Sequence, residues 1–209
     1  MFPPSIQKLV KIFSKFPTVG PRTAARFVFY LLGLEKEEVK ELLDAISTLK
    51  EKIRRCSFCF NPFEPAQISN KLGSGEGENE LCEICSNPKR DKSLLCVVEK
   101  ETDLETIEKT RKYRGRYFIL GGTVSKLKKQ GVKDLRTEEL IQRVKNSEIE
   151  EIILALNPTP EGEATLLYLE RLLKPLNKKI TRLGRGLPVG AELEYADEET
   201  LSSAFDNRK

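Results

Sequence analysis

Four of the five cysteines form two Cys-x-x-Cys pairs, and this pattern restricts the fold more than any other feature of the sequence. The pairs are Cys56/Cys59 and Cys82/Cys85, and 22 residues separate them, slightly more than the roughly 15 to 20 of common zinc patterns. Each pair can place two thiolates on a tight turn, and two such turns complete the tetrahedral sulfur shell that zinc accepts. Because the chain contains no histidine, we expect a metal site built from cysteine alone.

Two other uses of the paired cysteines remain open. They could form disulfides, which a reducing cytosol disfavours, or redox-active pairs, which rarely occur twice so close together. We favour one structural Zn²⁺ per chain, because four sulfur ligands leave no open coordination position for catalysis. The fifth cysteine, Cys96, lies in the apolar run "LLCVV". With no histidine to activate it, we expect it to be a buried packing residue.

The composition predicts a folded protein with a basic N-terminal end. Of 209 residues, 39% are hydrophobic and 33% charged, which is typical of a chain with a packed core. No apolar run approaches the roughly 20 residues of a membrane helix, and no signal peptide is evident, so we expect a cytoplasmic protein with no membrane partner. The first 30 residues hold five cations and no acidic residue. This asymmetry predicts a polyanionic partner, although a solvated basic helix face gives the same count.

Hydrophobic periodicity divides the chain into four expected parts with an overall α/β multidomain fold. Residues 1–53 read as three helices, and residues 54–92 as a small separate module that contains the paired cysteines. Residues 93–176 alternate apolar strands with amphipathic helices, which predicts a mostly parallel sheet covered on both faces. Residues 177–209 are expected to form a strand, a turn-rich stretch and a short closing helix.

The stretch "FPTVGPRTAARFVFYLL" resembles a helix-hairpin-helix element. Gly20 lies in the hairpin, Pro21 is at a helix start, and Arg22 and Arg26 are one turn apart. Backbone N–H groups at such a helix start can bind a phosphate while the arginines add charge, so the contact would not read bases. The alternative is an ordinary corner of a helical core. Elements of this kind usually have a second glycine where this chain has Thr18.

A second candidate site lies in "ILALNPTPEGEATLLYLERLL", where an apolar strand runs into an acidic loop and then a helix. Strand, acidic loop and helix is a common layout for a magnesium site. Glu161 and Glu163 supply carboxylates, but Asn157 and Thr159 are neutral. Alternatively, the two glutamates simply place favourable negative charge in the first turn of a helix.

The order of hairpin, four cysteines and α/β segment resembles the RecR family of bacterial recombination mediators over essentially the whole chain, with the best matches in "GRYFILGG", "ILALNPTPEGEATLLYLERLLKP" and "TRLGRGLPVGAELEYAD". The resemblance implies a Toprim domain. Catalytic Toprim proteins combine a glutamate with Asp-x-Asp to hold magnesium; Glu99 matches the glutamate, whereas Asn157 and Thr159 replace the aspartates. It therefore implies a degenerate site in a protein that is not an enzyme, with Mg²⁺ bound weakly or absent. Two departures are a long loop between the cysteine pairs and lysines 126, 128 and 129 in place of a Gly/Pro-rich stretch.

The same resemblance implies a nucleoid-associated protein of recombinational repair. It would bind double-stranded and gapped DNA, act with RecO-like and RecF-like partners, and form a dimer or a tetrameric ring through its N- and C-terminal regions. Candidate contacts are the N-terminal apolar residues Phe2, Ile6, Leu9, Phe13 and Phe16, which could instead complete the helical core. The alternative function is a magnesium-dependent Toprim nuclease or primase that uses Glu99, Glu161 and Glu163.

Overall fold

A computed structural model describes residues 2–65, 81–124, 135–145, 148–184, 186–187, 189–190, 192–206 and 208. Contacts divide the chain into two units, Met1–Ile53 and Arg54–Lys209. Most of the long loop between the cysteine pairs and lysines 126, 128 and 129 lie outside the described residues.

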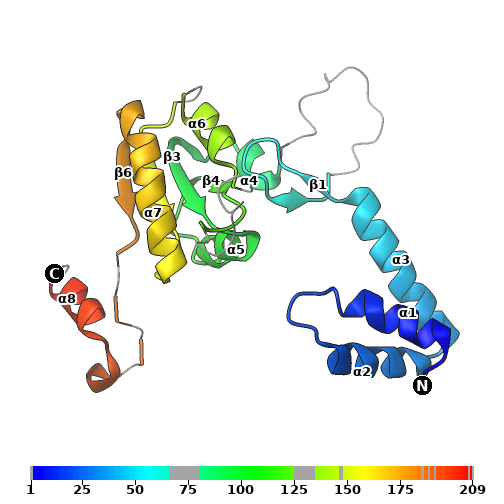
Figure 1. The fold of residues 1–209 in the computed structure, drawn as a ribbon. Helices are drawn as coiled ribbons and strands as arrows, with labels where there is room; N and C mark the ends of the chain where they lie inside the picture. Colours follow the sequence, from blue (N-terminus) through cyan, green and yellow to red (C-terminus); the bar gives the residue numbers. More distant parts are fainter. Residues whose placement is uncertain are drawn as a thin grey trace, which may run out of the picture. The chain divides into compact units, whose positions relative to one another are not determined.

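The first unit consists of three helices, as the periodicity predicts: α1 (Pro4–Phe13), α2 (Pro21–Leu32) and α3 (Lys36–Lys52) (Figure 1). Proline occupies the first helical position of α1 and α2, where its missing N–H costs no hydrogen bond. The two helices pack against each other over a small core that includes the buried residues Ala24 and Val28. Phe13 meets the rings of Phe16 and Phe27 at centroid distances of 5.6 and 6.1 Å. No residue of α3 is buried.

The second unit contains a four-stranded parallel sheet in the order β4-β3-β5-β6. Its strands are β3 (Asp91–Val98), β4 (Gly115–Ile119), β5 (Glu151–Ala155) and β6 (Lys179–Arg182). The last four residues of β3 are all buried. Successive side chains of a strand point to opposite faces, so both faces of this sheet are covered. The predicted parallel α/β architecture is therefore confirmed.

Within the described residues, the strands are connected by the helices α5 (Glu101–Lys109), α6 (Thr137–Lys145) and α7 (Pro160–Leu173). Helix α7 continues into the 3₁₀ turn Lys174–Leu176. Helix α5 ends at Lys109, because the chain leaves the helix at Thr110 and Arg111 adopts a left-handed φ of 56°. Since β6 pairs with β5, the sheet extends beyond the boundary that we expected at residue 176.

The C-terminal residues follow the sheet with a 3₁₀ turn (Leu193–Tyr195) and α8 (Glu198–Asp206), the expected closing helix. No helix among the described residues is both long enough and apolar enough to span a membrane.

The cysteine segment packs on the sheet and shares its core, which differs from the separate module that the composition suggests. It contains the antiparallel pair β1 (Arg54–Arg55) and β2 (Pro62–Phe63) and the short helix α4 (Glu83–Ser86). The N–H of Ile119 on β4 donates to the carbonyl of Cys59 at 3.0 Å. The centroids of the Phe60 and Phe118 rings lie 5.5 Å apart. The physical reason is that this segment has too few apolar residues for a core of its own.

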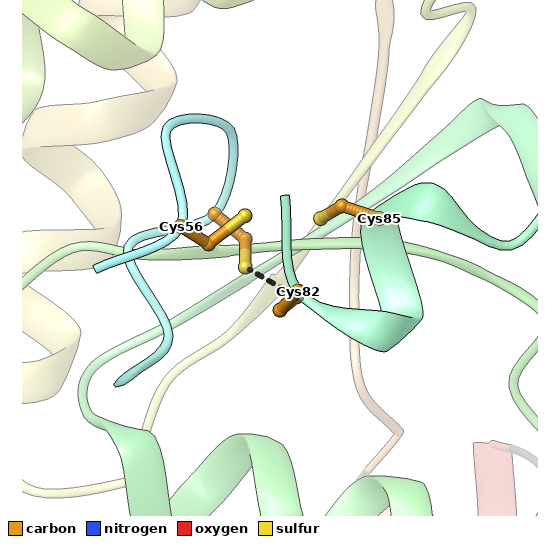
Figure 2. A group of neighbouring side chains, drawn as sticks. Cys56, Cys82 and Cys85 are labelled. Carbon is orange, nitrogen blue, oxygen red and sulfur yellow. Dashed lines mark hydrogen bonds between the residues drawn. The ribbon is translucent and has the colours of Figure 1, made fainter. Parts of the chain in front are cut away.

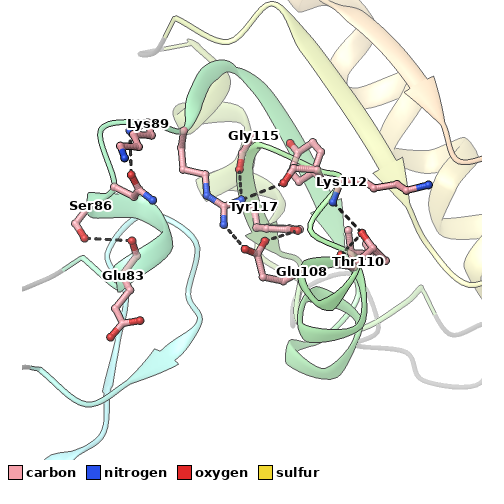
Figure 3. Close-up of polar contacts among 12 residues, drawn as sticks. Glu83, Ser86, Lys89, Glu108, Thr110, Lys112, Gly115 and Tyr117 are labelled. Atoms are coloured by element: carbon pink, nitrogen blue, oxygen red, sulfur yellow. Dashed lines mark hydrogen bonds and ion pairs between the residues drawn. The ribbon is translucent and has the colours of Figure 1, made fainter.

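A polar cluster fastens the end of the cysteine segment to the edge of the sheet (Figure 3). The Arg90 guanidinium donates to the Glu108 carboxylate and to the carbonyls of Tyr113 and Gly115, and the Tyr117 hydroxyl donates to Glu108 at 2.9 Å. Burial alone would raise the pKa of Glu108, but hydrogen bonds from Arg90 and Tyr117 outweigh it and lower that pKa. The cluster thus holds α5, β4 and the residues after α4 together.

Candidate functional site

The two Cys-x-x-Cys pairs meet in one buried cluster. The Sγ atoms of Cys56, Cys59, Cys82 and Cys85 all lie within 4.8 Å of one another, and those of Cys59 and Cys82 are 3.5 Å apart (Figure 2). All five cysteines are free thiols. Hydrogen bonds from Cys59, Cys82 and Cys85 lower the pKa of Cys56. Four convergent soft ligands in a buried site can hold one metal ion in a closed shell.

The turn that carries Cys56 and Cys59 is held by arginines of the sheet domain, which the sequence did not single out. The guanidiniums of Arg116 and Arg143 lie over the Phe58 ring, and that of Arg136 lies 4.7 Å from the centre of the Phe60 ring. Phe60 has a left-handed φ of 66°, a conformation unusual for a bulky residue. Arg116 lies on β4, Arg143 on α6 and Arg136 just before α6. Because these positions are separate in the sequence, no sequence motif identifies the three arginines.

Cys96 stands apart from this cluster. It is buried in β3, and burial raises the pKa of its thiol to about 12. At neutral pH the group is therefore a thiol and not a nucleophilic thiolate.

Thr18 and Gly20, in the hairpin between α1 and α2, adopt different backbone conformations. Thr18 adopts a left-handed φ of 64°, which explains why a glycine is usual at this position. Gly20 is the N-cap of α2 with a φ of −81°, a value open to any residue, and a side chain there would meet no atom within 4 Å. The structure of the chain alone therefore gives no reason for glycine at position 20.

Helix α2 presents an open N-terminus. No side chain caps it, no acidic residue lies in its first turn, and Arg22 and Arg26 are both exposed. Unpaired N–H groups and two cations one turn apart are the chemistry that a phosphate requires.

The residues of the expected acidic site lie at the carboxyl ends of two neighbouring strands. Glu99 follows β3 and Asn157 follows soon after β5. The connection from β3 leads to β4 on one side and that from β5 leads to β6 on the other, so this is the switch point where open α/β sheets bind ligands. The Asn157 amide Nδ2 donates to the Glu99 carboxylate at 2.9 Å.

The other residues of the acidic loop cap α7 or lie in its first turn. The Thr159 hydroxyl caps the helix by accepting from the Gly162 N–H at 3.1 Å, and a side chain on Gly162 would clash with the carbonyl of Asn157. Glu161 and Glu163 both lie in the first turn of α7, and the Glu163 carboxylate is 3.8 Å from the Arg182 guanidinium. The structure therefore brings Glu99 and Asn157 together, whereas Glu163 is turned toward β6.

Comparisons with known proteins agree with this architecture. Residues 6–50 match the helix-hairpin-helix region of RecR, residues 93–184 match the Toprim domain, and residues 186–209 match the C-terminal region of RecR. Recombination protein RecR of Thermobifida fusca (strain YX) is 44% identical over 209 residues, which cover all of this chain and 98% of that protein.

The chain belongs to the RecR family. A second RecR protein, from Bifidobacterium animalis subsp. lactis, is 46% identical over 205 residues that cover 98% of this chain and 96% of its own length. The matched Toprim region includes β6, in agreement with the pairing of that strand in the sheet.

Proposed function

We propose that this RecR-family chain is a non-catalytic mediator of recombinational repair that binds DNA through its hairpin. The observation that carries the proposal is the open N-terminus of α2 beside the exposed Arg22 and Arg26. Its contacts reach phosphates and not bases, so binding is independent of sequence and weakens with salt. The glycine at position 20 supports this function, because it leaves room for a phosphate to approach the helix start.

The absence of catalysis rests on the chemistry of the Toprim loop. A two-metal or one-metal phosphoryl site needs several carboxylates to hold its cations. Here an amide donates to Glu99, and the hydroxyl of Thr159 caps α7. Magnesium binding at Glu99 and Glu161 is accordingly weak or absent, and the loop serves as a contact surface for RecO-like and RecF-like partners. The competing function is a magnesium-dependent nuclease or primase.

The metal that we assign to the four cysteines is a structural zinc ion. Zinc prefers tetrahedral thiolate shells of this kind, and a closed shell activates no water. Its chemical contribution is to fix the fold of residues around the two Cys-x-x-Cys turns. The ligands are Cys56, Cys59, Cys82 and Cys85.

We also propose that several copies form a dimer or a ring-like tetramer around DNA. One hairpin makes only a few phosphate contacts, and linked copies raise avidity without further contacts. Apolar side chains that the described structure leaves exposed support an assembly, among them Phe2, Phe16, Leu43, Ile46 and Leu49 in the first unit. Of the expected N-terminal contact residues, Ile6, Leu9 and Phe13 are instead half-buried.

One experiment separates mediator from enzyme. The protein is incubated with labelled gapped duplex, nucleoside triphosphates and magnesium or manganese, and both complex and product are measured. We expect a complex and no cleavage or extension. Product that disappears with Glu99→Ala would establish the enzyme instead, whereas product that persists in this variant points to a contaminating activity.

A further inference from the structure

A hollow of about 430 Å³ lies at the end of the sheet opposite the Glu99 loop. It is bordered by Lys92 and Arg116, each the second residue of its strand, together with residues of α6 and Glu148, just before β5. Glu99 and Asn157, in contrast, follow the carboxyl ends of β3 and β5. Since the strands are parallel, the two sites are separated by the length of the sheet.

Two guanidiniums and an aromatic ring form one wall of this hollow. Those of Arg116 and Arg143 lie 4.9 and 4.6 Å from the centre of the Phe58 ring. Arg143 also donates to the carbonyl of Ser57, which fixes its position. The stacking presents flat cationic surfaces, which are good platforms for a nucleobase.

Arg116 brings positive charge to the hollow, and one N–H group of its side chain lacks a hydrogen-bond acceptor within the described part of the chain. Its Nε is buried, and no atom of the described residues accepts a hydrogen bond from it. A buried donor without a partner is unfavourable, and natural proteins rarely keep one without a reason. Arg116 itself borders the hollow, so the oxyanion of a ligand can pair with the accessible part of its guanidinium, and Lys92 on the adjacent strand adds a second cation.

The remaining polar groups of the lining narrow the class of ligand. Glu139, Gln142 and Glu148 offer acceptors for N–H donors. The two carboxylates would repel a run of DNA phosphates, so an extended duplex backbone fits poorly. A single nucleotide fits better: it has one phosphate for the cations, a flat base for stacking and, on adenine, guanine or cytosine, an amino group for the carboxylates. The volume lies within the range of small-ligand sites.

We propose that this hollow binds one unpaired nucleotide of single-stranded DNA, an inference that rests on the proposed function at gapped DNA. Its phosphate contacts Arg116 and Lys92, and its base stacks on the arginines beside Phe58. The hairpin makes phosphate contacts and does not distinguish duplex from single strand by base. The nucleotide pocket therefore gives the protein its preference for a gap over an intact duplex.

Titration with free nucleotides tests the pocket without relying on DNA binding by the hairpin. Deoxycytidine monophosphate, thymidine monophosphate, inorganic phosphate and succinate are the probes. We expect deoxycytidine monophosphate to bind most tightly and its affinity to fall roughly tenfold in Lys92→Gln and in Arg116→Lys, which keeps the charge but loses the flat fork. Lys109→Gln, at an exposed position of α5, is the control. Equal binding of all four probes, or of succinate alone, would overturn the proposal in favour of a general anion or acidic-peptide site, as would no binding.

A second measurement compares gapped with intact duplex. In the variants we expect the affinity for intact duplex to stay within twofold of wild type while the preference for gapped DNA disappears; an unchanged preference contradicts the pocket. If the wild-type protein binds no DNA of either kind, the proposed function fails, and the nucleotide titration still decides the pocket. Thermal unfolding of each variant establishes that it is folded. If Arg116→Lys is not folded, Lys92→Gln decides the question, because Lys92 is exposed near the start of β3.

Discussion

At the scale of single residues, Thr18 occupies a backbone conformation that suits glycine. A left-handed φ costs an L-residue roughly 1–2 kcal/mol, and a β-branched side chain has little freedom to relieve it. We expect Thr18→Gly to stabilise the hairpin by about 0.5–1 kcal/mol after the larger chain entropy of unfolded glycine is subtracted. Hydrogen exchange of α2 amides measures the gain. Thr18→Val, which keeps the branching, should show none, and a less protected α2 in Thr18→Gly would contradict the strain.

A substitution at Gly20 can separate an effect on stability from an effect on DNA binding. Serine is a good N-cap, so Gly20→Ser should leave the stability of the first unit unchanged or raise it by a few tenths of a kcal/mol. Its hydroxyl would, however, occupy the N–H groups that we assign to a phosphate. We therefore expect DNA affinity to fall several-fold in a gel-shift assay. Undiminished affinity would show that the start of α2 is not a phosphate site.

The lowered pKa of Glu108 should make the free energy of unfolding depend on pH in the acidic range. Its folded pKa is lowered, so its stabilisation is present above the unfolded pKa of about 4.3 and is lost as pH falls through the folded pKa. We expect Glu108→Gln to cost about 1–3 kcal/mol at pH 7, because it leaves Arg90 without its charged partner. In denaturant titrations the difference between variant and wild type should shrink toward pH 3. A difference that stays constant with pH would contradict the assignment.

At the scale of elements, the strands and helices follow from periodicity, whereas their packing does not. The apolar runs of β3, β4 and β5 and the three N-terminal helices are visible in the sequence, as are the four cysteines. The packing of Phe58 and Phe60 against Arg116, Arg136 and Arg143 is not, because it depends on contacts between distant segments. Likewise, the sequence shows that Asn157 replaces an aspartate. Its hydrogen bond to Glu99 cannot be read from the sequence, because it depends on how the sheet brings the ends of β3 and β5 together.

The shared core of the cysteine segment and the sheet changes what metal removal should do. We expect about one zinc per chain, and its removal by a chelator should destabilise β4 as well as the cysteine turns, because Ile119 donates to the carbonyl of Cys59. Hydrogen exchange at Ile119 reports this directly. The first unit, Met1–Ile53, provides the internal control, since it contributes no ligand. Loss of protection confined to the cysteine turns, or a metal-free protein with full protection, would contradict the coupling.

At the scale of the whole molecule, the exposed apolar residues of α3 predict self-association. We expect sedimentation at micromolar concentration to show a dimer or tetramer, and Leu43→Glu with Ile46→Glu to shift it toward monomer, since both side chains are more than half exposed in the single chain. Lys40→Glu, a charge change on the same helix, serves as the control. A wild-type monomer with and without DNA would rule out the ring.

The salt dependence of binding to gapped duplex tests the central claim most directly. Each phosphate contact contributes about one unit to the slope of log affinity against log salt. We predict that Arg22→Ala with Arg26→Ala lowers this slope by about two units and weakens binding equally on unrelated sequences. A variant whose slope equals that of the wild type would place the DNA contact elsewhere and contradict the assignment of the hairpin.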